Sequence, residues 1–347
     1  MLFKDNGACL VEYRDERLTL RIISQLQGST AVPGWKTVPQ KKVNALCQDY
    51  WDVVDDAVRS GAFNDSKASA LSALFPKLMT KGAQIRETLM DLPMTKALWT
   101  LAKNSATLLL VVPDSLLHVP WEALFNPYDG CKSFLGDFTV IARYPENPDG
   151  ETREPRMENK FRRERIVCVD NLLRKVIEAQ LVQDGENPVY PNNQCELARY
   201  VEDTRLTHWI CEHESKGLRF DTDVFFTAAD ASVHRFPTGS VLVLTSCKTG
   251  ASAPDVPSIA ARICCSSDCT VIAPSSLVAI TAGVQFARAI NLAISGSGGP
   301  LSVAQYWRRL GEARAAHMRD PANPAAPEAW ASLWYGIYGN VDRSLGG

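Results

Sequence analysis

From residue 108 onward, short apolar runs typical of β-strands alternate with segments that have helical spacing. The strand-like runs cover 108–112, 138–142, 165–169, 206–211, 240–246 and 270–274, and helical segments begin near 172, lie near 195 and cover 257–265, 278–293 and 302–316. Such alternation predicts a mostly parallel sheet covered by helices, because parallel strands need long crossover connections and are buried on both faces. We therefore expect an α/β fold.

The first hundred residues have a different pattern. Two strand-like runs, Leu10 to Tyr13 and Leu18 to Ile23, flank the charged turn 14–17, which is typical of a β-hairpin. Helical spacing follows over 43–58, from about 67 to 79 with Pro76 as a kink or early stop, and from about 82 to 101. We expect residues 1–105 to form a hairpin and a helical layer that belongs to, or packs on, a core of residues 106–347.

Residues 145–165 are the clearest linker in the chain. They contain Pro145, Pro148 and Pro155, together with several basic residues, and few apolar ones. This composition predicts a solvated loop that joins the two halves of the core. Because exposed linkers are preferred sites of proteolysis, a processing site is the alternative.

The overall composition is that of an ordinary globular protein: 347 residues, 46% hydrophobic and 22% charged. The formal net charge of −2 does not favour nucleic acid or an anionic membrane as a partner. The start of the chain does not resemble a secretory signal, and no run approaches the roughly 18 apolar residues of a transmembrane helix. We expect a cytoplasmic protein.

The ten cysteines are scattered along the chain. In a cytoplasmic protein this distribution predicts reduced thiols and no disulfide framework. Cys264, Cys265 and Cys269 form the one close group, but a second pair of ligands at zinc-site spacing is missing from the sequence around them. We therefore expect structural cysteines there, and neither a metal nor a cofactor.

Two of the apolar runs are each followed by a polar segment that contains a reactive side chain. The run 241–245 leads to Cys247 and then to Gly250, and the run 206–211 leads to His213 and then to Gly217. Reacting groups in open α/β sheets gather at the carboxyl ends of the strands, so two adjacent parallel strands would bring His213 beside Cys247. An imidazole next to a thiol raises its thiolate fraction and protonates the leaving amine, which predicts a nucleophile and its base.

Three further stretches accompany this pair. Residues 109–124 read as an apolar strand, a Pro-Asp turn and then Leu-His-Val-Pro-Trp-Glu-Ala-Leu; residues 271–274 read Val-Ile-Ala-Pro; and residues 330–339 form a Trp-Ala…Tyr-Gly ending. With His213 and Cys247 they resemble the CHAT domain, a caspase-like cysteine peptidase group related to separase, caspases and gingipains. The resemblance runs from about residue 43 to residue 339. It implies a caspase-like fold, catalysis by His213 and Cys247, and a structural or pocket-supporting role for His118.

The chain departs from this family at two places. Glu214 stands where the family has a glycine whose backbone N–H helps to hold the oxyanion, and we assign that role to the backbone N–H of Glu214. The segment 275–281 lacks the acidic residue that lines a pocket for Arg or Lys in some members. Ser275, Thr281 and, from another loop, Asp255 are the candidates for the substrate pocket, and we expect an uncharged residue on the amino side of the cleaved bond (P1).

The resemblance implies a cysteine endopeptidase that cleaves one or a few protein substrates in a bacterial defence or regulated cell-death system, antiviral defence included. A separate sensor or regulatory protein would control it. One alternative is a pseudopeptidase that keeps the fold as an interaction module. Another is a flavodoxin-like domain that binds or hydrolyses a small molecule, which the stretch 109–124 does not favour.

Overall fold

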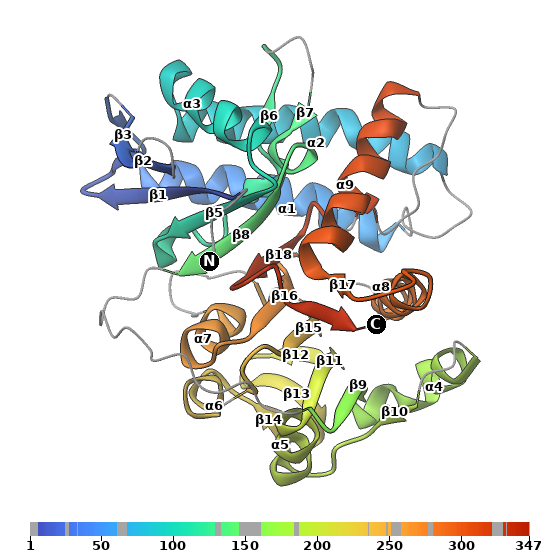
Figure 1. The fold of residues 1–347 in the computed structure, drawn as a ribbon. Helices are drawn as coiled ribbons and strands as arrows, with labels where there is room; N and C mark the ends of the chain where they lie inside the picture. The colour runs from blue at the N-terminus through green and yellow to red at the C-terminus, as the bar shows by residue number, and fades with distance from the viewer. Residues whose placement is uncertain are drawn as a thin grey trace. The chain divides into compact units, whose positions relative to one another are not determined.

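The computed structural model describes residues 6–24, 28–32, 34–60, 68–128, 133–145, 161–183, 187–234, 236–247, 249–250, 258–276, 280–320, 329–330 and 332–346. The chain divides into two compact units. Unit 1 contains residues 1–146 and 307–336, and unit 2 contains residues 147–306 and 337–347. Helices cover the β-sheet of each unit (Figure 1). The main sheet of unit 2 is parallel, as the alternation of the sequence predicts, whereas the sheet of unit 1 combines parallel and antiparallel pairs.

The elements of unit 1 are β1 (Asn6–Arg14), β2 (Arg17–Ser24), β3 (Gly28–Ala31), β4 (Lys36–Thr37), α1 (Gln40–Arg59), α2 (Ala68–Leu89), α3 (Leu92–Lys103), β5 (Thr107–Val112), β6 (Phe125–Asn126), β7 (Ser133–Phe134) and β8 (Val140–Pro145), with 3-10 helices η1 (Asp114–Leu116), η2 (Trp121–Ala123) and η3 (Leu135–Asp137). Its sheet has the order β3-β2-β1-β5-β8. β1 pairs with β2 antiparallel and with β5 parallel, and β5 pairs with β8 parallel.

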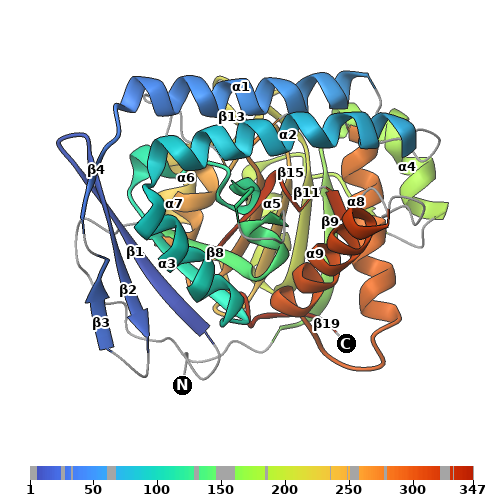
Figure 2. The same cartoon turned by 90° about the horizontal axis from the view of Figure 1, so that it is seen from above.

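The predicted N-terminal hairpin is confirmed. Its turn consists of Asp15 and Glu16, which have positive φ angles of 51° and 58°. A two-residue turn with both central residues in this region matches the twist of the two strands it joins. The predicted helical layer follows, with α1 and α2 side by side (Figure 2) and α3 packed on β1, β2 and β5.

The early stop at Pro76, one of the two predicted alternatives, and the new helix from about residue 82 are wrong. α2 continues through Pro76 to Leu89, and the next helix begins only at Leu92. A proline costs the helix one backbone hydrogen bond, but the burial of Leu78, Ile85 and Leu89 on the same helix outweighs that loss. The side chain of Asp91 then caps α3 by accepting a hydrogen bond from the Met94 N–H at 2.9 Å.

The segment around His118 builds the core of unit 1. Trp121 is fully buried, and its indole N–H donates to the Leu116 carbonyl at 3.2 Å. Arg143, 1% exposed, donates to the Leu117 carbonyl at 3.1 Å and forms an ion pair with the buried Glu122. Burial, with a smaller contribution from Arg143, lowers the pKa of His118 to about 4. These contacts agree with a structural role for this stretch.

The elements of unit 2 are β9 (Arg163–Val169), η4 (Asn171–Leu173), α4 (Arg174–Gln183), β10 (Pro188–Val189), α5 (Gln194–Glu202), β11 (Thr204–Ile210), β12 (Glu212–Glu214), β13 (Gly217–Asp221), β14 (Val224–Phe226), α6 (Ala228–Val233), β15 (Val241–Thr245), α7 (Ile259–Ser266), β16 (Thr270–Pro274), α8 (Ile280–Ser295), β17 (Leu301–Ser302) and β19 (Ser344–Gly346). Two elements, α9 (Val303–Arg319) and β18 (Tyr335–Tyr338), each begin in one unit and end in the other.

The sheet of unit 2 has the order β10-β9-β11-β15-β16, and all of these pairs are parallel. β11 and β15 are direct neighbours, with Ile210 opposite Thr245 at their carboxyl ends. The prediction that the strands leading to His213 and to Cys247 are adjacent and parallel is therefore confirmed.

Helices cover both faces of this sheet. On one face, Ile210 packs in an apolar cluster with side chains of α4 and α8, including Ile177 and Val284. Side chains alternate along a strand, so the side chain of Trp209, the residue before Ile210, points to the opposite face of the sheet. There it contacts Phe220 and Phe226 edge-on and lines a small hollow with residues of α5 and with His234.

Candidate active site

His213 lies in a strand that the sequence did not predict. β11 ends at Ile210, and His213 is the central residue of β12, which forms a three-stranded antiparallel sheet with β13 and β14. A turn of two residues, 215 and 216, connects β12 to Gly217 at the start of β13. Gly217 has a φ of +135°, and a Cβ atom there would lie 2.5 Å from the Phe226 carbonyl oxygen. Only glycine fits this corner, so Gly217 fixes the hairpin that carries His213.

Cys247 follows the buried strand β15 by two residues and is half-buried. Hydrogen bonds fix the residues around it: the Thr249 hydroxyl donates to the Ser246 carbonyl at 3.0 Å, and the Gly250 N–H donates to the Pro274 carbonyl at 2.9 Å. The Tyr338 hydroxyl donates to the Gly250 carbonyl. Residues 246, 249 and 250 are therefore held in place by hydrogen bonds, and the strand before Cys247 is entirely buried.

The structure brings His213 and Cys247 together. Nδ1 of His213 lies 3.0 Å from the carbonyl oxygen of Cys247. A carbonyl oxygen only accepts, so Nδ1 carries the proton in this contact, and in the neutral ring Nε2 is the basic nitrogen. Burial lowers the pKa of His213, and the bond to Cys247 acts in the opposite direction. An imidazole that is neutral near pH 7 is suited to accept a proton.

The neighbouring cysteine and histidine are unsuited to this chemistry. Burial raises the pKa of Cys211, which keeps its thiol protonated. His208 is 1% exposed, its Nε2 lies 2.7 Å from the Thr245 hydroxyl, and burial lowers its pKa to about 3. Both side chains belong to the interior.

Of the three predicted pocket side chains, the structure describes that of Ser275. Ser275 directly follows β16, the neighbour of β15, and is 2% exposed; its hydroxyl has no hydrogen-bond partner among the described residues. Thr281 lies in α8, but its side chain is outside the described part of the chain, as is Asp255. Most of the predicted linker, residues 146–160, also lies outside the described residues.

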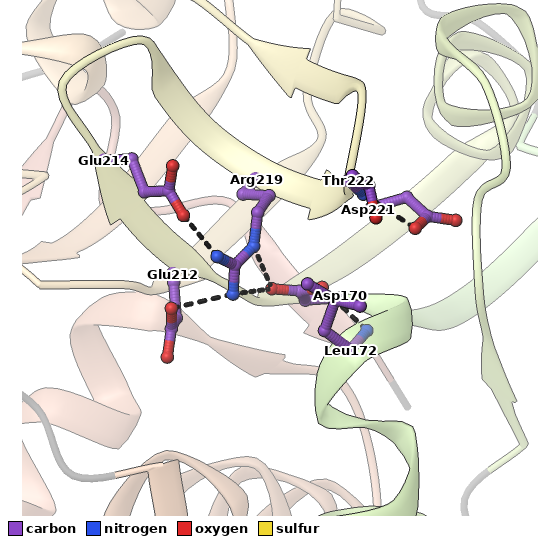
Figure 3. A network of polar contacts seen from close by, with 7 residues as sticks. All are labelled: Asp170, Leu172, Glu212, Glu214, Arg219, Asp221 and Thr222. Atoms are coloured by element: carbon purple, nitrogen blue, oxygen red, sulfur yellow. Dashed lines mark hydrogen bonds and ion pairs between the residues drawn. The ribbon is translucent and has the colours of Figure 1, made fainter.

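An ion-pair cluster beside His213 was not predicted from the sequence (Figure 3). Nε of Arg219 donates to Asp170 at 3.1 Å, its Nη2 donates to Glu212 at 2.7 Å, and its Nη1 pairs with Glu214. Asp170 stands at the carboxyl end of β9, 49 residues before Arg219. A pairing over such a separation leaves no local signal in the sequence.

Within the described ranges, no group of three or more His, Cys, Asp and Glu side chains is arranged to hold a metal ion. Among the same residues, no helix combines the length and the apolar composition needed to cross a membrane.

No protein-family model and no curated protein sequence matches this chain. Solved structures do: in two crystal structures of the Saccharomyces cerevisiae separase–securin complex, a chain matches with a TM-score of 0.52 at 9% and 10% sequence identity. Each match covers 96% of this chain and 30% of the other, so this chain spans less than a third of the protein it resembles. At such low identity the likeness defines the fold, which is the caspase-like fold of separase.

Proposed function

We propose that this chain is a cysteine endopeptidase of the CHAT type, with Cys247 as nucleophile and His213 as base. The observation that carries the proposal is the 3.0 Å contact between His213 Nδ1 and the Cys247 carbonyl, in segments that follow two neighbouring parallel strands of a caspase-like fold. The contact sets the tautomer of the ring that this chemistry requires.

The proposed reaction has two stages. His213 Nε2 takes the proton of the Cys247 thiol, the thiolate attacks the substrate carbonyl, and the same imidazole then protonates the leaving amine. Water hydrolyses the thioester with His213 again as base. We assign the backbone N–H of Glu214 to the oxyanion and Ser275 to the substrate pocket, because Ser275 follows the strand next to β15 and its hydroxyl has no hydrogen-bond partner among the residues that the structure describes. No metal or cofactor takes part in this scheme.

The substrate and the regulation are also part of the proposal. We infer that the chain cleaves one or a few proteins in the bacterial cytoplasm, in a defence or cell-death system, under the control of a separate protein. The matching separase structures contain securin as a bound protein, which agrees with control by a partner. We further propose that residues 1–105 belong to, or pack on, the peptidase core of residues 106–347.

A pseudopeptidase that acts as an interaction module is the second candidate. The residue after His213 is Glu214, whose side chain is held by Arg219, where the CHAT family has a glycine. A peptide-library cleavage profile of the purified protein, with Cys247→Ala as control, separates the two candidates. Cleavage that Cys247→Ala abolishes supports the peptidase. A wild-type protein that neither cleaves the library nor reacts at Cys247 with an electrophilic peptide refutes it.

A further inference from the structure

The position of His213 depends on a short strand. β12 has only three residues, and it pairs with β13 through Glu212 opposite Arg219, His213 opposite Leu218, and Glu214 opposite Gly217. Side chains alternate between the faces of a strand, so Glu212 and Glu214 share one face and His213 points to the other. Directly opposite residues share a face, which places Arg219 with the two glutamates.

Arg219 connects this hairpin to the main sheet. Its guanidinium, on a side chain that is only 15% exposed, binds both glutamates and the carboxylate of Asp170 at the end of β9 (Figure 3). One planar group therefore holds residues on both sides of His213 and fastens them to a different strand. Charge-assisted hydrogen bonds of this kind are stronger than those between neutral groups.

Hydrogen bonds of both its side chain and its backbone fix the position of Asp170. Its side chain is fully buried, its second oxygen accepts from the Leu172 N–H at 2.9 Å, and its own N–H donates to the Ile210 carbonyl at 2.9 Å. Burial raises the pKa of Asp170, while the Leu172 N–H and Arg219 act against that rise. Since a buried carboxylate needs a cation to remain ionised, Asp170 and Arg219 depend on each other.

From this geometry we propose that Arg219 is the positioning residue of His213. Its single positive charge reduces the repulsion among the three carboxylates that it binds, and by holding Glu212 and Glu214 it keeps the imidazole on the Cys247 carbonyl. Without it, Asp170, Glu212 and Glu214 repel one another, and β12 loses the side-chain link through Arg219 to Asp170 at the end of β9. This inference rests on the proposed function in one respect, because it gives His213 a task that requires a fixed position.

The guanidinium is specifically required. Lysine has the same charge but presents it as a single point on a flexible chain, and it does not span three carboxylates in a fixed plane. Arg219→Lys and Arg219→Gln should therefore both release His213, with the lysine variant closer to the wild type. Arg174→Gln is the matched control, because Arg174 forms an exposed pair with Glu178 on α4 of the same unit.

The decisive measurement is the ring of His213 itself. The chain has five histidines, so ¹⁵N-histidine NMR spectra can be assigned with a His213→Ala reference. We expect the wild type and Arg174→Gln to show the Nδ1-protonated tautomer and a lowered pKa for His213. Both Arg219 variants should show mixed tautomers and a pKa nearer the usual value of about 6.5. If Arg219→Gln does not fold, the His213 spectrum of Arg219→Lys is compared with that of the wild type instead.

Identical His213 spectra in the wild type and in the variants that fold would overturn the inference, whether or not the protein cleaves peptides. If the wild type is a peptidase, kcat should also fall by about 10- to 100-fold in Arg219→Gln with little change in KM, since a small displacement of a catalytic group has this effect. A shifted tautomer in a protein without peptidase activity would support the positioning role and refute only the proposed reaction.

Discussion

Nδ1 of His213 donates to the backbone carbonyl of Cys247, the residue whose side chain the same imidazole is proposed to activate. The bond therefore links the base directly to the backbone of the nucleophile. This hydrogen bond occupies Nδ1 of His213, so Nε2 is the nitrogen available for proton transfer. The two residues come from separate loops, and the parallel pairing of β11 with β15 brings those loops to the same edge of the sheet.

Replacing either residue should abolish proteolysis without unfolding the protein. We expect Cys247→Ala and His213→Ala each to keep less than about 1% of the wild-type kcat/KM, because the general base alone contributes at least about 100-fold. Thermal unfolding should change little, since both side chains are only partly buried. Cys195→Ala is the control, because Cys195 is an exposed thiol of the same unit and should remain fully active. Activity that survives in Cys247→Ala would show that another nucleophile is used.

The pH dependence follows from the lowered pKa of His213. Below that pKa the imidazole is protonated and no longer accepts the thiol proton, so activity falls on the acid side. Because burial lowers the pKa, we expect the acid limb of kcat/KM to lie below the usual imidazole value of about 6.5. Profiles between pH 4.5 and 8 measure it, and an acid limb above pH 7 would contradict the assignment.

A control for folding is needed in this experiment. Burial lowers the pKa of His208 to about 3 and that of His118 to about 4, so the unfolded chain binds protons before the folded protein does. Stability therefore falls as the pH drops below about 6.5, by about 2 kcal/mol for each histidine on reaching pH 5. Circular dichroism at each pH separates this loss from the titration of His213.

The strands around the site were predictable because each is a short, fully apolar run with a polar boundary. Every residue of β15 is buried, and the run 241–245 shows this directly. The same logic predicted β11 and its neighbour, and hence that His213 and Cys247 share an edge of the sheet.

The small sheet that carries His213 was not predictable in the same way. β12 has three residues, two of them glutamates, so it lacks the apolar alternation by which a strand is recognised. Its stability comes from Arg219, Gly217 and Asp170, which are tertiary contacts. Glu214 departs from the family pattern, but in the structure it is one of the three carboxylates that pair with Arg219.

Gly217→Ala should damage the hairpin. The left-handed φ of +135° is unfavourable for alanine, and its Cβ would lie 2.5 Å from the Phe226 carbonyl oxygen. We expect a loss of about 1 to 3 kcal/mol in the free energy of unfolding and a larger relative loss of activity, because His213 moves with this corner. Gly299→Ala is the control, since nothing lies within 4 Å of a Cβ atom there. Urea unfolding and kcat/KM measure both effects, and equal behaviour of the two variants would refute the argument.

The preference at P1 should be for an uncharged residue. A cation desolvated without a carboxylate costs several kcal/mol, and Ser275 offers a hydroxyl only. Fluorogenic peptides with Arg, Lys, Asp, Leu or Ala at P1 test this expectation. A strong preference for Arg or Lys would contradict it, and loss of that preference in Asp255→Asn would then identify the acid. Ser275→Ala should raise KM if its hydroxyl contacts the substrate.

The ion pair of Glu122 with Arg143 should be essential for stability in unit 1. Both side chains are at most 5% exposed, and Arg143 needs a counter-ion in that environment. Glu122→Gln keeps the shape and removes the charge, so we expect a loss of about 3 to 5 kcal/mol in the free energy of unfolding.

Glu12→Gln is the control for this last experiment, because Glu12 and its partner Arg21 in unit 1 are 39% and 47% exposed, and the substitution should cost less than about 1 kcal/mol. Urea midpoints at pH 7 measure both variants. Burial raises the pKa of Glu122, whereas the charge of Arg143 and their hydrogen bond oppose that rise. A loss no larger than that of the control would therefore mean that Glu122 is already protonated in the folded protein, so that the Arg143 cation donates to a neutral carboxyl group.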